Sequence, residues 1–117
     1  MSIVTIIIKA APYQGDNNTW HALRFAGASL AEDMEVQVHL LDKGVEVGRS
    51  GHQVAEGDTN LEELLSELIE CGLEVRACGM ALDDYGIAEG ELIAGIEKGS
   101  MKSLAAWVKE SDNVLTF

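Results

Sequence analysis

The sequence predicts an α/β fold, a three-layer sandwich whose central, mostly parallel sheet has about five strands. Apolar runs such as Ile3–Ala10 lack polar alternation, which is typical of strands buried on both faces of a parallel sheet. Between these runs, apolar residues recur at helical spacing. Alternating strands and helices form right-handed crossovers that place helices on both sides of the sheet. A chain of 117 residues has room for one core, so we expect a single domain over residues 1–117.

After the first strand, Pro12 and Gly15 indicate a turn. Asp16 or Asn17 then caps a helix that ends near Glu32. The sheet-facing stripe of this helix consists of Leu23, Ala26, Gly27 and Leu30. Three side chains lie off the stripe and form either a second packing surface or a subunit interface: Trp20, Arg24 and Phe25.

The middle of the chain predicts a second buried strand at Val36–Leu41, followed by a loop. The strand contains His39, which we expect to be a core histidine with satisfied hydrogen bonds. Glycine and polar residues dominate from Gly44 to Gly57, which predicts a mobile loop carrying Arg49 and His52. Two roles stay open for this loop: a lid over a later strand end, or a contact with a neighbouring subunit.

The next helix begins after Asn60 and ends at Gly72, and its apolar face consists of Leu61, Leu64, Leu65, Leu68 and Ile69. Leu73–Cys78 is the third strand. The segment Asp83–Gly95 mixes a turn with a short helix, and Ile93–Lys98 includes a short fourth strand.

Ser100 caps the last helix, whose apolar residues are Leu104, Ala105, Trp107 and Val108. Val114–Phe117 closes the sheet as a terminal strand.

The charge of the chain narrows the classes of partner. A net charge of −12 argues against nucleic acids and anionic membranes, because both need basic patches. The negative charge serves either solubility or an acidic docking surface. The N-terminal segment lacks the basic region of a signal peptide, and no apolar run approaches the roughly 20 residues that span a bilayer. We therefore expect a cytoplasmic protein.

Several familiar sites are absent from the sequence. It contains no Walker loop, no dinucleotide-binding glycine pattern after the first strand and no His-Glu-x-x-His motif. The run Gly48-Arg-Ser-Gly-His lacks the final glycine of a nucleophile elbow. Neither cysteine has a second ligand at metal spacing, so we expect no metal and no cofactor.

The two cysteines differ in their predicted settings. Cys71 closes a helix and Cys78 closes the strand that follows, which separates the two thiols by roughly 20 Å at about 3.3 Å per residue. A disulfide needs Cα atoms within about 7 Å, so both thiols are expected to be free. We expect Cys71 to be a half-buried structural residue. Cys78 falls at the carboxyl edge of the sheet, where α/β proteins bind ligands and helix amino ends favour a thiolate.

Five segments distributed over the whole chain resemble the DsrE/DsrF-like (YchN-fold) family of small sulfur-handling proteins. They are Ala-Pro-Tyr-Gln-Gly-Asp, Asn-Thr-Trp-His-Ala-Leu-Arg-Phe-Ala, Ala-Cys-Gly-Met-Ala-Leu-Asp-Asp-Tyr-Gly-Ile, Gly-Ser-Met-Lys-Ser-Leu-Ala-Ala-Trp-Val and Asp-Asn-Val-Leu-Thr-Phe. The resemblance implies that Cys78 carries sulfur as a persulfide between a donor and an acceptor protein. It also implies a homo-oligomer, a trimer or hexamer. The residues implied to flank the cysteine are Pro12, Tyr13, Gly79, Met80, Ser100 and Met101.

Two departures from the family pattern concern the surroundings of this cysteine. Many relatives have a second cysteine where this chain has Ala81, so an internal dithiol cycle is unavailable. Tyr85 stands where an arginine is frequent, and it follows Asp83 and Asp84, whose negative charges disfavour a thiolate. Two hypotheses follow: sulfur relay by Cys78, or a non-catalytic oligomeric binding or scaffold protein that uses the same strand-end pocket for a small ligand or partner.

Overall fold

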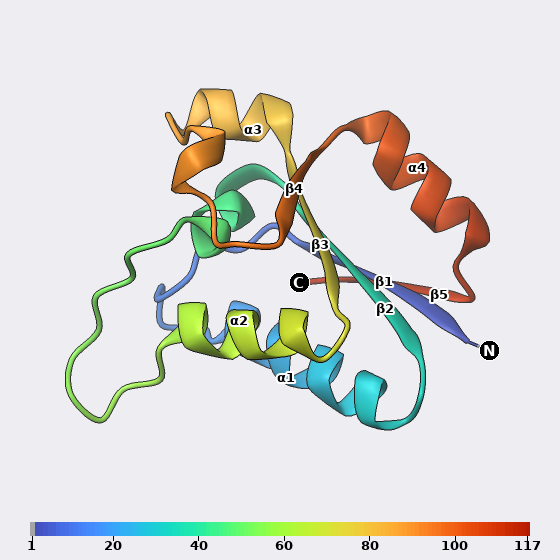
Figure 1. Ribbon diagram of the computed structural model, residues 1–117, viewed down its shortest axis with the longest axis horizontal. Coiled ribbons are helices and arrows are strands. Elements are labelled where there is room, and N and C mark those ends of the chain that lie inside the picture. The colour runs from blue at the N-terminus through green and yellow to red at the C-terminus, as the bar shows by residue number, and fades with distance from the viewer. Residues whose placement is uncertain (1) are drawn as a thin grey trace.

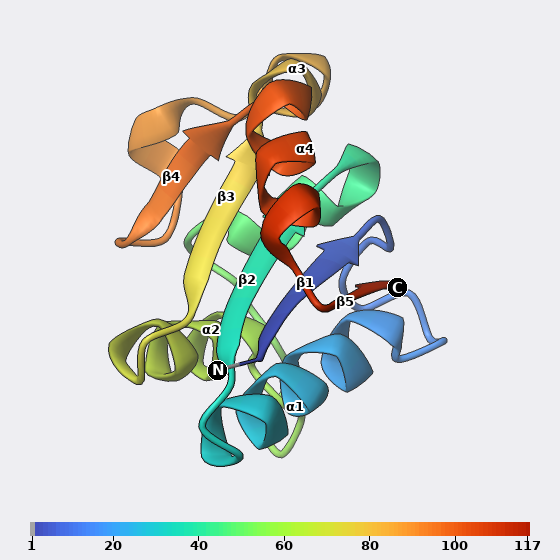
Figure 2. The same cartoon turned by 90° about the vertical axis from the view of Figure 1, so that its right-hand side faces the viewer.

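The computed structural model describes residues 2–117 and confirms the predicted α/β class. Five strands form one parallel sheet in the order β4-β3-β2-β1-β5. The strands are β1 (Ile3–Ile8), β2 (Glu35–Leu40), β3 (Glu74–Cys78), β4 (Ile96–Gly99) and β5 (Asn113–Thr116). Helices α1 (Asn18–Ala31) and α2 (Leu61–Glu70) cover one face of the sheet, and α4 (Met101–Glu110) covers the other (Figures 1 and 2). The short helix α3 (Gly79–Asp84) follows β3 directly. No helix within residues 2–117 combines the length and apolarity needed to cross a membrane.

The two faces of the sheet differ in polarity. Side chains alternate between the faces of a strand, and the apolar core on the α1/α2 side includes Val4, Ile6, Ile8, Val36, Val38, Leu40, Val75 and Ala77. On the α4 side the sheet buries Thr5, Gln37 and His39. Thr5 and Gln37 hydrogen-bond to Ser111 and Glu110 at the end of α4. A neutral polar layer therefore lies under α4.

The order of the strands defines a reversal in the path of the chain. From β1 to β4 each connection moves one strand further in the same direction. The connection through α4 then returns across the opposite face to place β5 beside β1 (Figure 2). In open α/β sheets ligands bind where adjacent connections diverge, beyond the carboxyl ends of the strands. In this strand order that point lies between β1 and β5, and β3 and β4 lie at the opposite edge of the sheet.

The segment after β2 corrects the prediction of a mobile loop over Gly44–Gly57. A 3-10 helix, η1 (Asp42–Gly48), occupies its first part, and the side chains of Val45 and Val47 are fully buried. A Cβ on Gly44 would lie 2.0 Å from the carbonyl oxygen of Ile8. The glycine is therefore required by close backbone packing and is not a sign of flexibility. The residues after Ser50 run without helix or strand until α2 begins.

Three smaller differences concern element boundaries and one thiol. The helix predicted within Asp83–Gly95 begins earlier, at Gly79, and only a 3-10 turn (Glu89–Glu91) lies inside that range. The fourth strand is Ile96–Gly99, which begins inside the predicted range Ile93–Lys98 and ends one residue beyond it. Both cysteines are free as expected, but Cys71 is exposed at the end of α2 and does not pack as a half-buried residue.

Candidate functional site

Cys78 is the last residue of β3, and it lies beside β4, the strand after which the chain returns across the sheet. Its register partner across the sheet is Gly99, the last residue of β4. Ser100 follows at once and begins α4. The thiol-bearing residue is buried, with 6% of its surface exposed. The sequence prediction that this cysteine ends a strand at the carboxyl edge of the sheet is therefore correct.

The amino end of α4 is fixed beside this cysteine by a reciprocal cap. The Ser103 backbone N–H donates to Ser100 Oγ at 3.1 Å, and the Ser100 N–H donates to Ser103 Oγ at 2.9 Å. The helix has ten residues, and aligned peptide dipoles make its amino end partially positive. An anion at the ends of β3 and β4 is stabilised by this arrangement.

Two basic side chains flank the end of β3. Arg76 lies two residues before the cysteine and stacks over the Trp107 ring, 4.3 Å from its centroid. The Lys98 stem lies against Gly79, because a Cβ on that glycine would come within 2.5 Å of Lys98 Cε. The Lys98 ammonium forms an ion pair with Glu89, with 3.8 Å between Nζ and Oε1.

The carboxylates of α3 are exposed, whereas Tyr85, which caps the end of this helix, packs partly against the core. Asp83 and Asp84 are exposed in the last turn of the helix. The Tyr85 hydroxyl donates to Asp42 Oδ1 at 2.9 Å, and this hydrogen bond raises the pKa of Tyr85. Tyr85 therefore joins the end of α3 to the start of η1.

The rim of the site carries two exposed methionines. Met80 follows Cys78 by two residues and is 75% exposed, while Met101 follows Gly99 by two residues and is 63% exposed. Methionine is flexible and polarisable, and it is used at surfaces that bind proteins. Gly79, Met80, Ser100 and Met101 thus gather at the ends of β3 and β4.

His39 is buried as predicted, but its hydrogen bonds are not satisfied. The side chain is fully inaccessible, and neither Nδ1 nor Nε2 has a hydrogen-bond partner. Its ring meets Trp107 edge to face, with centroids 6.1 Å apart. Burial lowers the pKa of His39, the nearby Ser100 backbone opposes this shift, and the charge of Arg76 adds to it. The imidazole is therefore neutral at pH 7.

The structure places Pro12 and Tyr13 at the end of β1, two strands away from β3 in the sheet. Tyr13 lines a cavity of about 600 Å³ between the β1–α1 turn and the chain before α2. Pro12 lines an adjacent one of about 590 Å³ together with Arg49 and His52. Neither cavity includes Cys78.

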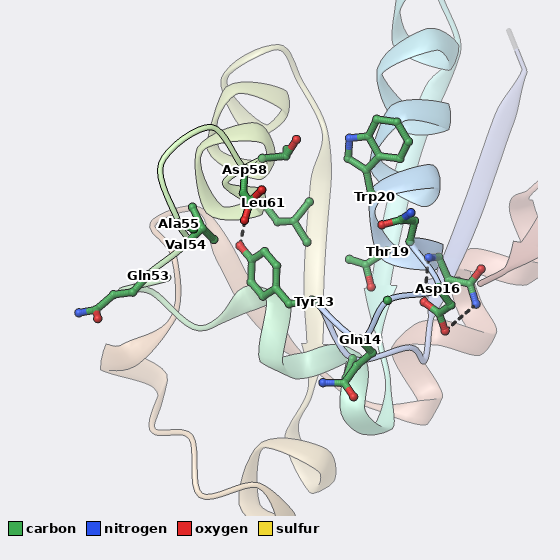
Figure 3. A pocket seen from close by; sticks show the side chains of 15 residues that line it. Tyr13, Gln14, Asp16, Thr19, Trp20, Gln53, Val54, Ala55, Asp58 and Leu61 are labelled. Atoms are coloured by element: carbon green, nitrogen blue, oxygen red, sulfur yellow. Dashed lines mark hydrogen bonds between the residues drawn. The ribbon is translucent and has the colours of Figure 1, made fainter.

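The cavity beside Tyr13 has polar and aromatic walls (Figure 3). The Tyr13 hydroxyl accepts from the Leu61 N–H at 3.0 Å and shares a 2.7 Å hydrogen bond with His52 Nδ1. Burial raises the pKa of Tyr13. The further polar and aromatic wall residues are Gln14, Asp16, Asn17, Asn18, Thr19, Trp20, Gln53, Asp58 and Thr59. The sequence shows no motif for this cavity, because its walls come from two loops far apart in the chain.

No group of three or more His, Cys, Asp or Glu side chains in residues 2–117 is arranged to hold a metal ion. The chemistry at the strand ends is therefore described by the thiol, the two cations and the amino end of α4.

A parallel sheet covered by helices on both faces, with one thiol at the carboxyl end of a strand, defines a class of small α/β proteins. The chain belongs to the DsrE/DsrF-like family, whose model matches residues 2–117.

Relatives of full length are found in archaea and bacteria. Uncharacterized protein MK0008 of Methanopyrus kandleri is 42% identical over 117 residues, covering 100% of this chain and 95% of that protein. Protein YchN of Escherichia coli is 31% identical and covers 100% of both chains. The crystal structure of E. coli YchN superposes with a TM-score of 0.92 over 100% of both chains, at 31% identity. A protein of unknown function from Methanobacterium thermoautotrophicum shares the fold, with a TM-score of 0.82 at 17% identity over 100% of both chains.

Proposed function

We propose that this protein carries sulfane sulfur as a persulfide on Cys78 and passes it between a donor and an acceptor protein. The observation that carries the proposal is the position of Cys78. It ends β3 at the carboxyl edge of the sheet, level with Gly99 and beside the capped amino end of α4. Membership of the DsrE/DsrF-like family supports the proposal.

The chemistry is thiol exchange with one resident cysteine. A thiolate is the attacking species in such exchange, and the amino end of α4 and Arg76 favour an anion at this edge. Ala81 leaves α3 without a resolving cysteine, and Cys71 lies before β3, at the opposite end of that strand. The partner protein must therefore supply the second sulfur atom of each exchange.

Access to Cys78 requires a docked partner that moves the rim. Only 6% of the cysteine is exposed, whereas Met80 and Met101 stand out beside it. Because methionine side chains adapt their shape, a partner that binds them opens a path to the sulfur without moving the backbone. This behaviour fits a protein donor and a protein acceptor.

The proposal includes a homo-oligomer, a trimer or hexamer. Strand β5 forms one edge of the sheet, and its Val114 and Leu115 side chains are 39% and 37% exposed. Exposed edge strands with apolar side chains invite pairing with another chain, and natural proteins cover or blunt them. A second copy of this chain is a natural cover for β5.

The test is intact mass spectrometry after incubation with glutathione persulfide. Wild type and Cys71→Ser are expected to gain one or more sulfur atoms, and a reductant is expected to remove them. Cys78→Ser is expected to gain none while keeping the same melting temperature. A folded Cys71→Ser protein that gains no reducible sulfur would rule out Cys78 as the carrier.

A binding function is the second candidate, and the cavity beside Tyr13 favours it. This cavity holds about 600 Å³, within the range of small-molecule sites, and has no thiol in its wall. Its charged wall residues are Asp16 and Asp58, so it suits a cationic or hydroxyl-rich ligand better than an anion. Thermal shift with a panel of amines and sugars tests it. A stabilisation that Tyr13→Phe abolishes supports this function, and the absence of any shift argues against it.

A further inference from the structure

His39 is a buried titratable group that the packing of the core leaves unexplained. Both ring nitrogens lack partners although the side chain is fully inaccessible. Burying an unpaired polar group is unfavourable, so such a group in a native fold calls for an explanation, and a chemical role is one. The position of the ring in the sheet indicates the group on which the histidine acts.

The imidazole lies on the α4 side of the sheet and reaches toward Gly99, the register partner of Cys78. In the register of the sheet, His39 on β2 is level with Arg76, and Cys78 is level with Gly99 on β4. Yet His39 Nε2 lies 2.8 Å from the position that a Cβ on Gly99 would occupy. To reach β4, the ring must pass over β3 between Arg76 and Cys78. Register partners share a face of the sheet, so the Cβ of Cys78 points to the side on which the ring lies.

We propose that His39 is the general base that takes the proton from the Cys78 thiol and later returns it to the leaving group. This inference rests on the proposed sulfur transfer at Cys78. No hydrogen bond joins the two groups in the resting structure. The transfer requires Cys78 to rotate about its Cα–Cβ bond, and catalytic hydrogen bonds are often formed only when the reactants are bound.

The proposed step is balanced without any further reactant. The S–H proton of Cys78 moves to a ring nitrogen of His39 as the sulfur attacks the terminal sulfur of a donor persulfide, R–S–SH. The S–S bond of the donor breaks, and its electron pair leaves on R–S⁻. This thiolate takes the proton from His39. The products are Cys78–S–SH and R–SH, so the reaction exchanges a sulfur atom and consumes no oxidant.

The surroundings of the ring suit a neutral base. The groups near the ring are Arg76 from β3, Gly99 from β4, the Ser100 backbone, and Ser103 and Trp107 from α4. Arg76 is the charged member of this set, and it opposes a lasting imidazolium. The proton is therefore held on His39 only while the S–S bond is exchanged.

The test measures alkylation of Cys78 by iodoacetamide in a Cys71→Ser background, where Cys78 is the remaining thiol. The pH profile is the informative readout. With His39 as the base, the alkylation rate of Cys78 reaches its plateau before pH 7, because the imidazole has already lost its proton at that pH. In His39→Gln the rate is expected to rise about tenfold per pH unit towards pH 8.5, where an ordinary thiol ionises. His21→Gln changes an exposed histidine on α1 and is the matched control, with an unchanged profile.

A second variant moves the ring without removing it. In Gly99→Ala the new methyl group displaces Nε2, and the same change of profile is expected. Sulfur loading of Cys78 from glutathione persulfide is expected to slow about 100-fold in both variants, within the range for general bases. Identical pH profiles for wild type and a folded His39→Gln or Gly99→Ala protein would overturn the inference. The pH profiles could change as expected although neither wild type nor any variant gains sulfur. In that case sulfur transfer is ruled out as the function, and the role of His39 in deprotonating Cys78 stands.

Discussion

Gly44→Ala tests the packing that replaces the predicted loop after β2. The added Cβ would lie 2.0 Å from the carbonyl oxygen of Ile8, 2.7 Å from its carbonyl carbon and 3.3 Å from the Lys9 nitrogen. All three atoms are backbone, so no flexible side chain can move aside. The start of η1 or the end of β1 must shift instead.

The expected loss is at the upper end of the range for overpacked cores, about 3 kcal/mol. For a domain of this size, about 1 kcal/mol lowers the melting temperature by roughly 4 °C, so a fall of about 12 °C is expected. Urea unfolding followed by circular dichroism measures the free energy directly. Gly90→Ala is the control, because nothing lies within 4 Å of a Cβ there. Equal stability of Gly44→Ala and wild type would refute the close approach of η1 to β1.

Four further substitutions test the site and its supports. Ser100→Ala removes the cap of α4 and should lower the free energy of unfolding by about 1 kcal/mol in urea titrations; no change would mean that the reciprocal bonds with Ser103 are not formed. Tyr13→Phe leaves the Leu61 N–H without its acceptor and should cost about 1–2 kcal/mol by the same assay, whereas Tyr85→Phe removes an exposed hydrogen bond and should change the stability much less. The pKa of His39 is lowered in the folded state, so between its folded and unfolded values the unfolded chain binds more protons and stability falls as pH drops below about 6.5. His39→Gln should remove that part of the pH dependence, and identical pH–stability curves for the two proteins would show that the histidine does not titrate differently on folding.

The sequence predicts the strands and the position of Cys78 because short apolar runs and their glycine breaks are local signals. It does not predict η1. Gly44 looks like a flexible residue, and its contact with Ile8 depends on a strand that lies far away in the chain.

The sequence does not predict the polar face of the sheet under α4, for a related reason. His39 sits within an apolar run, so the sequence predicts an ordinary core residue. The lack of hydrogen-bond partners for its two ring nitrogens can be recognised only once the register of the three strands is known. The same holds for Tyr13, which the family resemblance places beside the cysteine and which the fold places at the end of β1.

The central claim is that Cys78 both receives and releases sulfur. The most direct measurement loads the Cys71→Ser protein from a persulfide labelled with heavy sulfur, removes the donor, and adds an unlabelled thiol. The account predicts that mass spectrometry finds the label on Cys78 first and then, in equal amount, on the added thiol. A label that never appears on Cys78, or that stays there in the presence of excess thiol, would contradict it.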